Sequence, residues 1–334
     1  MPNLRLTIDT AALVANWRAL ALGGATTGAA VKADAYGLGA QPVVDALARA
    51  GCREFFVATL DEAGALVMPP GTRLAVLHGV HAGEITVALA GAAVPVLSTA
   101  AQVAAWRAAA PNRVCDVMVD TGLNRIGLTP AEATSGLLDG LAIDVLHSHL
   151  ACADTPDSPM NAIQLGTFVR LVAAIPARRA ALAASAGIGL GADYAFDLTR
   201  PGIALYGGRG STAVAGIAAR VVQVRDVPAG ASVGYGATWT AARPSRIAVL
   251  NLGYADGLPC ALALHGGAFA GGKRVPIAGR VSMDLAAFDV TDTGIAEGDW
   301  LDLDFDLAVA SAATGRSEYE LLTGLGHRYA RAQR

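Results

Sequence analysis

From the N-terminus to about residue 210, short apolar runs alternate along the chain with longer, alanine-rich amphipathic stretches. This alternation is typical of strand–helix units built around a parallel sheet. Roughly eight repeats in about 210 residues favour a closed (β/α)8 barrel over an open sheet. The predicted strands lie in the runs LRLTID, AAVKA, EFFVATL, RLAVLHGV, VPVLS, VCDVMVD, IDVLHSHL, AALAASAG and IALYGG.

After about residue 215 the pattern changes to β-type runs separated by Gly, Pro and Asp turns, and only the closing SEYELLTGL has a helical pattern. The β-type runs include IAARVVQVRDV, SRIAVLNLGYADG and KRVPIAGRVSMDLAAFDVTD. We therefore expect an α/β protein of two domains. The predicted domains are a (β/α)8 barrel over residues 1–215 and a mostly antiparallel β domain over residues 216–334.

Composition narrows the class of protein. Of the 334 residues, 53% are hydrophobic and 16% are charged, which suits a large folded core. The net charge is −3 and basic residues form no stripe, so the sequence favours neither a nucleic-acid nor a membrane partner. There is no secretory pattern at the N-terminus and no apolar stretch of ~18–20 residues, so we expect a cytoplasmic protein. The scattered cysteines, Cys52, Cys115, Cys152 and Cys260, indicate reduced thiols rather than a metal site.

A lysine stands at the end of a predicted strand. Lys32 closes the apolar run on the second predicted strand and precedes a glycine-containing turn around Tyr36. Active sites of barrels form at the carboxyl ends of the strands. A lysine among apolar groups has a lowered pKa and forms Schiff bases with aldehydes. The alternative is a lysine whose stem is buried while its ammonium group reaches water.

A glycine-rich segment follows the seventh predicted strand. It contains Ser185, Gly187, Gly189 and Gly191, and Gly202–Ile203 come at the eighth strand. Loops after strands seven and eight of such barrels commonly bind phosphate through backbone N–H groups. The run GIGLG does not meet the dinucleotide pattern G-x-G-x-x-G. A phosphate site and an ordinary tight turn both remain open.

Two arginines lie at predicted strand ends. Arg200 is inside the glycine-rich segment, and Arg125 lies just beyond the sixth predicted strand. A guanidinium is a fixed cation and donor that can hold a carboxylate bidentately. Either arginine alone would more often be structural, but two at strand ends favour a ligand site.

The tripeptide HSH places His147 and His149 on one face of a strand. No third histidine or carboxylate follows at metal-ligand spacing, so we expect no metal and favour a hydrogen-bonding role for His149. In the second domain, Tyr254 lies in a glycine-bounded turn and Met283 in the compact turn GRVSMD. A tyrosine can transfer a proton if its surroundings lower its pKa from about 10. Structural hairpin turns are the alternative for both.

Together these stretches resemble the alanine racemases, pyridoxal-phosphate enzymes with a (β/α)8 barrel and a C-terminal β domain. The resemblance covers nearly the whole chain, in order and spacing: AVKADAYGLG, VDTGLNRIGL, HLACAD, ASAG, LTRPGIALYG, SVGYGATW, GYADG, GRVSMD and YELLTGLG. It implies an isomerase that interconverts L- and D-alanine with pyridoxal 5'-phosphate and supplies D-alanine to peptidoglycan.

The resemblance also implies residue roles. Lys32 would hold the cofactor as a Schiff base and then act as one catalytic base. Tyr254 would be the opposite base, contributed by the other subunit of a head-to-tail homodimer. Two bases on opposite faces of a planar intermediate are what racemisation needs. Arg200, supported by His149, would face the pyridine nitrogen, where an arginine does not stabilise a protonated ring as a carboxylate would.

The remaining implied contacts concern the two anionic groups. The cofactor phosphate would be lined by Tyr36, Ser185, Gly202 and Ile203, and the substrate carboxylate would meet Arg125 and the main chain at Met283. The sequence departs from the family at three positions: Met118 replaces a lysine that many relatives modify to a carbamate, His327 replaces a tyrosine, and Leu150 replaces a phenylalanine. Asn124 or a bound anion would then have to orient Arg125.

Three alternatives to an alanine racemase remain from the sequence. One is a racemase for serine or another small amino acid, because the sequence does not measure the room in the pocket. A second is a non-catalytic carrier of pyridoxal phosphate, although such carriers lack the second domain. A third is a Schiff-base aldolase that works without a cofactor.

Overall fold

The computed structural model describes residues 2–21 and 23–334, which form two compact units. One unit comprises Val14–Ala35 and Ala40–Leu205, and we call it the barrel unit. The other comprises the N-terminal residues through Leu13, Tyr36–Gly39 and Tyr206–Arg334, and we call it the β unit. The β unit therefore includes three segments from within the predicted first domain, 1–215: the N-terminal residues through Leu13, Tyr36–Gly39 and residues 206–215. None of the described helices is long and apolar enough to span a membrane.

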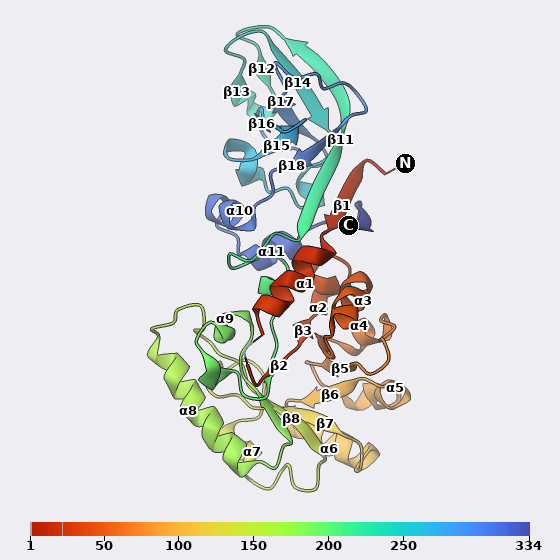
Figure 1. Ribbon diagram of the computed structural model, residues 1–334, viewed down its shortest axis with the longest axis vertical. Helices are drawn as coiled ribbons and strands as arrows, with labels where there is room; N and C mark the ends of the chain where they lie inside the picture. The colour runs from red at the N-terminus through yellow and green to blue at the C-terminus, as the bar shows by residue number, and fades with distance from the viewer. Residues whose placement is uncertain (1, 22) are drawn as a thin grey trace. The chain divides into compact units, whose positions relative to one another are not determined.

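Among the described residues, eight parallel strand segments close the barrel unit, and Figure 1 shows helices around these strands. Strands β3 to β9 pair in chain order, and β10 pairs in parallel with β2, which precedes β3 in the same extended segment. A bridge between Ala184 and Arg200 joins the β9 and β10 segments, so the predicted (β/α)8 fold class is confirmed. The strands are β2 (Thr26–Thr27), β3 (Ala29–Ala30), β4 (Glu54–Val57), β5 (Arg73–Val76), β6 (Val94–Leu97), β7 (Cys115–Met118), β8 (Ile143–His147), β9 (Arg179–Ala181) and β10 (Leu198–Thr199).

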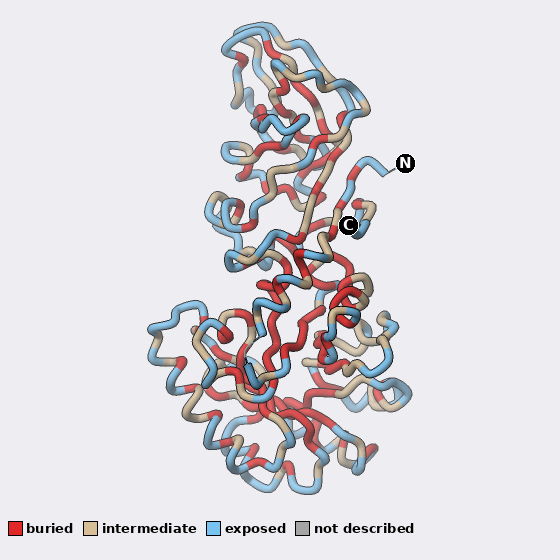
Figure 2. Tube along the Cα trace, viewed as in Figure 1, coloured by how far each residue is buried: buried red, intermediate tan, exposed pale blue. Residues whose placement is uncertain are grey.

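Helices follow the barrel strands, and several begin at side-chain caps that the sequence supplies. Thr59 and Thr99 accept hydrogen bonds from the amides of Glu62 and Gln102, which satisfies free N–H groups of the first turn. Strands such as β4, β7 and β8 are buried along their whole length, as Figure 2 shows, because helices cover the outside of a parallel barrel. Helix α1 (Thr10–Ala19) precedes the barrel strands, and the helices that follow them are α3 (Ala40–Ala50), α4 (Leu60–Gly64), α5 (Ile85–Ala90), α6 (Ala100–Ala109), α7 (Pro130–Ala133), α8 (Pro159–Ala174) and α9 (Ser185–Ile188).

The β unit is built around one long strand, β11 (Ala215–Val227), which pairs antiparallel with β1, β14 and β18. Two short strands, β12 (Ser232–Val233) and β13 (Trp239–Thr240), form a separate hairpin. The other elements are β1 (Leu4–Ile8), β14 (Ser245–Leu250), β15 (Gly267–Ala270), β16 (Lys273–Pro276), β17 (Ala286–Asp289), β18 (Trp300–Leu303), α10 (Leu307–Thr314), α11 (Glu318–Thr323) and β19 (Ala330–Gln333).

Three expectations about individual elements were wrong. The run LRLTID is not a barrel strand: β1 pairs with β11 and β19, because its alternating burial suits a sheet with one covered face. The run IALYGG forms a short 3-10 helix at Ile203–Leu205, and the eighth strand is β10. Helix α10 in the β unit has no counterpart in the sequence-based prediction. With β1 removed from the barrel, Lys32 follows the first barrel strand and Arg125 follows the fifth.

Candidate active site

The chain leaves the first barrel strand at Lys32 in a left-handed turn. Ala33, Asp34, Ala35 and Tyr36 have φ values of 52°, 53°, 52° and 57° in the segment labelled α2 (Lys32–Tyr36). Each such residue costs about 1–2 kcal/mol relative to the right-handed form, since its Cβ crowds the following carbonyl. A run of strained residues persists only where the surroundings enforce it, and such runs gather at functional sites.

Two carboxylates hold this turn within the barrel unit. Glu62 accepts hydrogen bonds from the amide of Ala33 at Oε1 (2.8 Å) and from the amide of Ala58 at Oε2 (2.6 Å). Asp34 Oδ1 accepts the amide of Ala40 at 2.7 Å. The lysine is thus anchored at the strand end by the side chain of Glu62, a residue that the sequence analysis did not single out although it lies in a T-x-x-E capping pattern.

The environment of Lys32 lowers the pKa of its amine. Burial is the largest cause, the positive charges of Arg125 and Arg200 add to it, and Glu62 opposes it. A lowered pKa increases the neutral, nucleophilic fraction of the amine, as Schiff-base chemistry requires. The structure therefore brings three of the predicted residues, Lys32, Arg125 and Arg200, within electrostatic reach of one another.

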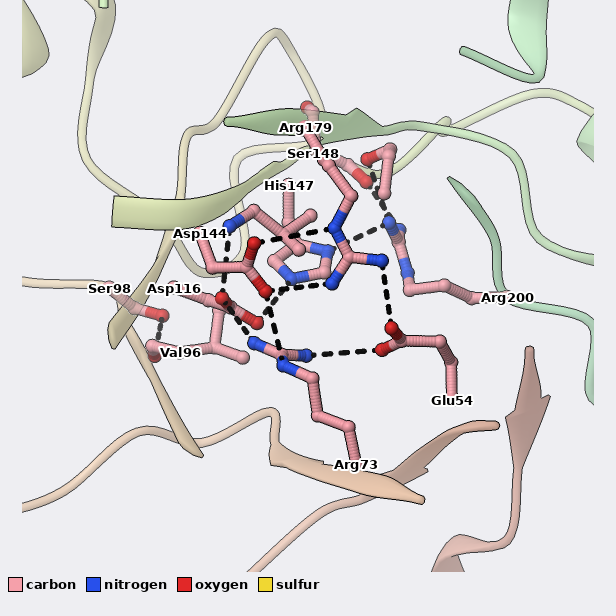
Figure 3. Close-up of polar contacts among 12 residues, drawn as sticks. Glu54, Arg73, Val96, Ser98, Asp116, Asp144, His147, Ser148, Arg179 and Arg200 are labelled. Atoms are coloured by element: carbon pink, nitrogen blue, oxygen red, sulfur yellow. Dashed lines mark hydrogen bonds and ion pairs between the residues drawn. The ribbon is translucent and has the colours of Figure 1, made fainter. Parts of the chain in front are cut away.

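Arg200 crosses the barrel interior immediately after β10 (Figure 3). Its side chain is buried, and Nη1 donates to the carbonyl of Ala181 (2.7 Å) and lies 3.0 Å from Nδ1 of His147. Nη2 donates to the carbonyl of Ser148 (2.6 Å) and, more weakly, to that of Leu182 (3.4 Å). Burial lowers the pKa of Arg200 to about 10, while the carboxylate of Asp116 opposes that change, so the group is a cation at neutral pH.

The imidazole in contact with Arg200 is His147, whereas the sequence analysis assigned that support to His149. His149 lies just beyond the end of β8, and burial, together with the charges of Arg200, Arg125 and Lys32, lowers its pKa to about 3. It is therefore a neutral ring at physiological pH, next to three cationic groups. The supporting role of His149 stays a prediction.

The ends of β9 and β10 form a compact cradle of hydroxyl and amide groups. Ser185 Oγ accepts hydrogen bonds from the amides of Gly202 (2.9 Å) and Ala204 (3.3 Å). These contacts place Ser185 beside the segment that contains Gly202 and Ile203, all of them buried in the barrel unit. Small residues and backbone amides at strand ends seven and eight are the usual surroundings of a phosphate in this fold.

The loop of Arg125 is shaped by a carboxylate. Asp120 accepts hydrogen bonds from the amides of Gly122 (2.8 Å), Asn124 (3.1 Å) and Arg125 (2.9 Å). Burial by itself would raise the pKa of Asp120, but these amides outweigh it and keep the pKa below its ordinary value. Asp120 thus fixes the backbone of Arg125. The group that orients its guanidinium, for which the sequence offered Asn124 or a bound anion, stays a prediction. An aspartate followed by a Gly- and Asn-containing turn is the signal that could have found Asp120.

Tyr36, Tyr254 and Met283 belong to the β unit. The ring centroid of Tyr36 lies 4.8 Å from that of Tyr206, and burial raises the pKa of its hydroxyl. The amide of Tyr254 donates to the carbonyl of Ser282 (3.0 Å), and that of Ala255 donates to the carbonyl of Met283 (3.0 Å). The two sequence-predicted turns are therefore joined by backbone hydrogen bonds, with the side chains of Tyr254 and Met283 exposed.

The fold and these groups define an α/β-barrel protein whose strand-end lysine, buried arginine and glycine-rich cradle suit Schiff-base chemistry beside a bound anion. Residues 8–210 match the family model for the alanine racemase N-terminal domain, and residues 214–333 match that for the C-terminal domain. The chain belongs to the alanine racemase family.

Individual relatives agree with this family assignment. The chain is 46% identical over 353 residues to an alanine racemase of Acidiphilium cryptum, with 99% of each chain covered. It is 43% identical over 364 residues to a biosynthetic alanine racemase of Agrobacterium fabrum, covering 98% of this chain and 93% of that one. A crystal structure of alanine racemase from Bartonella henselae with covalently bound pyridoxal phosphate superposes with a TM-score of 0.88 at 36% identity, covering 100% of both chains.

Proposed function

We propose that this protein catalyses the interconversion of L- and D-alanine with pyridoxal 5'-phosphate as cofactor. The observation that carries this proposal is the position of Lys32, a strand-end amine with a lowered pKa beside Arg125 and Arg200. The name of the Acidiphilium cryptum relative and the covalently bound cofactor of the Bartonella henselae structure support it.

The residues of the barrel unit fit this cofactor. Lys32 supplies an amine for its aldehyde, and the cradle supplies the hydroxyl of Ser185 for its phosphate, next to the backbone amide of Gly202, which donates to that hydroxyl oxygen. Among the described residues no group accepts a hydrogen bond from Nε of Arg200, which leaves that donor for the ring nitrogen. Because Arg200 is a cation that keeps its proton, the ring nitrogen beside it would stay unprotonated.

The proton transfers fall to two residues of the chain. When bound, the cofactor withdraws electrons from the substrate and thereby acidifies its α-proton. Lys32 would take or return this proton at Nζ on one face. Tyr254 does the same at its phenolic oxygen on the other face, and Arg125 and the main chain at Met283 hold the substrate carboxylate. Movement of the proton between opposite faces is what inverts the configuration.

The proposal includes a head-to-tail homodimer in which Tyr254 serves the active site of the partner subunit. Its support is the exposure of two apolar residues whose turns are joined by backbone hydrogen bonds: Tyr254 and Met283 are 45% and 54% exposed. Exposed apolar groups of this kind are typical of a surface that a partner covers. We also propose a cytoplasmic enzyme that provides D-alanine for peptidoglycan, with functional domains at residues 1–215 and 216–334.

The test is incubation of the purified protein with a panel of L-amino acids, with chiral detection of the D-products. We expect the D-enantiomer of alanine to form faster than that of any other amino acid. If D-serine formed faster than D-alanine, serine rather than alanine would be the preferred substrate. A protein that binds the cofactor but forms no D-product would instead be a carrier. A protein that forms no D-product and also lacks the absorption band of bound cofactor would leave the Schiff-base aldolase as the interpretation.

A further inference from the structure

A chain of buried polar side chains runs through the barrel interior behind Arg200 (Figure 3). Asp116 on β7 and His147 at the end of β8 both have side chains with 0% exposure, and Nε2 of His147 lies 3.0 Å from Oδ2 of Asp116. Nδ1 of the same imidazole lies 3.0 Å from Nη1 of Arg200. His147 therefore bridges a carboxylate on one strand and a guanidinium that follows another.

The guanidinium of Arg200 determines which ring nitrogen of His147 carries the proton. Arginine has N–H donors and no acceptor, so Nδ1 of His147 must accept the hydrogen bond from Nη1. The ring proton then lies on Nε2 and points at Asp116. Burial lowers the pKa of His147 to about 4, although Asp116 opposes the change, and this agrees with a neutral imidazole. An imidazolium would set two donors, Nδ1–H and Nη1–H, against each other.

Asp116 is in turn fixed as an ionised acceptor. Its Oδ1 accepts hydrogen bonds from Nη2 of Arg73 (2.6 Å) and from the amide of Val145 (3.0 Å), which leaves Oδ2 for His147. Burial would raise the pKa of Asp116, but the hydrogen bonds and charges of His147 and Arg73 lower it overall. Each hydrogen bond in the series Arg73–Asp116–His147–Arg200 therefore has one fixed donor and one fixed acceptor.

We propose that Asp116 and His147 are positioning residues that fix Arg200 with Nε available to the ring nitrogen of the cofactor, an inference that rests on the proposed function. The bridge and the carbonyls of Ala181, Ser148 and Leu182 occupy Nη1 and Nη2. A guanidinium held by its two terminal nitrogens presents its third nitrogen in one orientation. This is how a supporting shell of hydrogen bonds fixes a functional side chain.

Asp116→Asn is the sharpest test because it reverses the donor and acceptor in the hydrogen bond between residue 116 and His147. The amide oxygen would stay with Arg73 and Val145, and the amide nitrogen would face Nε2 of His147 as a donor. The histidine would then carry its proton on Nδ1, against Arg200. The 15N chemical shifts of the histidine side chains distinguish the two tautomers, and a His147→Gln spectrum assigns the signal. We expect the Nε2–H form in the wild-type protein and the Nδ1–H form in Asp116→Asn, both measured without cofactor.

The cofactor provides the second readout. Asp116→Asn should weaken pyridoxal-phosphate binding by about tenfold or more, the effect of a lost hydrogen bond to a charged group. Asp144→Asn is the matched control. Asp144 pairs with Arg73 and Arg179 in the same network but does not contact His147, so this variant should keep the wild-type tautomer. It should also bind the cofactor as the wild-type protein does.

A second pair of variants keeps the test decisive if Asp116→Asn does not fold. His147→Gln retains an acceptor for Arg200 and a donor for Asp116, whereas His147→Leu retains neither. We expect near wild-type cofactor affinity and absorption spectrum for the glutamine variant, and weaker binding with a changed spectrum for the leucine variant. The proposal is overturned by an Nδ1–H or doubly protonated His147 in the wild-type protein, or by equal affinities of His147→Leu and His147→Gln. A wild-type protein that binds no pyridoxal phosphate would overturn the proposed function instead, whatever the tautomer.

Discussion

Arg328 and Asp256 form a bidentate ion pair within the β unit, with Nε–Oδ1 and Nη2–Oδ2 distances of 2.6 and 2.8 Å. The third nitrogen, Nη1, donates to Oδ1 of Asp284 at 2.7 Å. Asp256 follows Tyr254 by two residues, and Asp284 follows Met283 directly. One guanidinium therefore ties the turn of the proposed catalytic tyrosine to the turn of the proposed substrate contact.

Replacing this guanidinium should loosen both turns. Arg328→Gln leaves the carboxylate of Asp256 buried with the amide of Gly253 but without its ion pair. We expect the free energy of unfolding to fall by about 1–3 kcal/mol, toward the lower value because Arg328 is half exposed and water can reach the site. Urea denaturation measures this change. Arg316→Gln, at an exposed arginine, is the control. Equal decreases in the free energy of unfolding for the two variants would contradict the proposed role of Arg328 in joining the two turns.

The chain contains two lysines, Lys32 and Lys273, which makes the attachment site simple to test. Lys32→Ala should abolish both covalent cofactor binding and racemisation, because no other buried amine remains in the barrel. Borohydride reduction followed by peptide mass spectrometry should find the label on Lys32 alone. Lys273→Ala, at an exposed position of β16, should keep label and activity. Label on Lys273 in the wild-type protein would refute the assignment.

Tyr254→Phe removes one proton-transfer oxygen and leaves Lys32 in place. We expect the variant to keep the colour of the bound cofactor and to lose most of its turnover, chiefly from L- to D-alanine, with a loss of about 10²–10⁴-fold. Initial rates measured in both directions check the asymmetry. Tyr194→Phe, outside the proposed site, serves as the control for loss of a tyrosine hydroxyl. Normal rates in both directions for Tyr254→Phe would defeat the two-base assignment.

Arg200→Glu exchanges a cation at the proposed ring nitrogen for a carboxylate. A carboxylate stabilises a protonated pyridine ring, so electron withdrawal should become stronger and abortive transamination should increase. The measurement is the accumulation of pyridoxamine phosphate during incubation with alanine. An unchanged rate of transamination in a variant that still binds the cofactor would show that Arg200 does not limit this side reaction.

The buried histidines make stability depend on pH. Burial lowers the pKa of His147 and His149 to about 4 and about 3, from an ordinary value of 6.5. Below about pH 6.5 the unfolded chain therefore binds protons that the folded chain does not. The free energy of unfolding should fall between about pH 6.5 and 4, by at most about 1.4 kcal/mol per pH unit for each histidine.

Urea denaturation at several pH values in this window measures the slope. His147→Gln removes one of the two groups and should give a shallower slope than the wild-type protein. His265→Gln, at an exposed histidine of the β unit, is the control and should keep the wild-type slope. The interpretation fails if the slopes of the two variants are equal.

The alternation of apolar runs with amphipathic stretches predicted the barrel, because burial on both faces makes most positions of strands such as β4 and β7 apolar. The strand-end lysine and the glycine-rich cradle were also predicted, since local spacing places them at one edge of a parallel barrel. The run LRLTID, in contrast, is compatible with either sheet. Its place beside β11 depends on pairing with residues more than 200 positions away, which no local pattern encodes.

The sequence by itself determined the fold class, the family resemblance and the candidate side chains, because these depend on periodicity and on short motifs. Only the tertiary structure decided what supports those side chains. Glu62 holds the left-handed turn after Lys32, Asp120 holds the backbone of Arg125, and His147 forms a hydrogen bond with Arg200. Each of these is a hydrogen bond between distant segments or across a loop. Its existence depends on directions and distances of about 3 Å that appear only when the chain is folded.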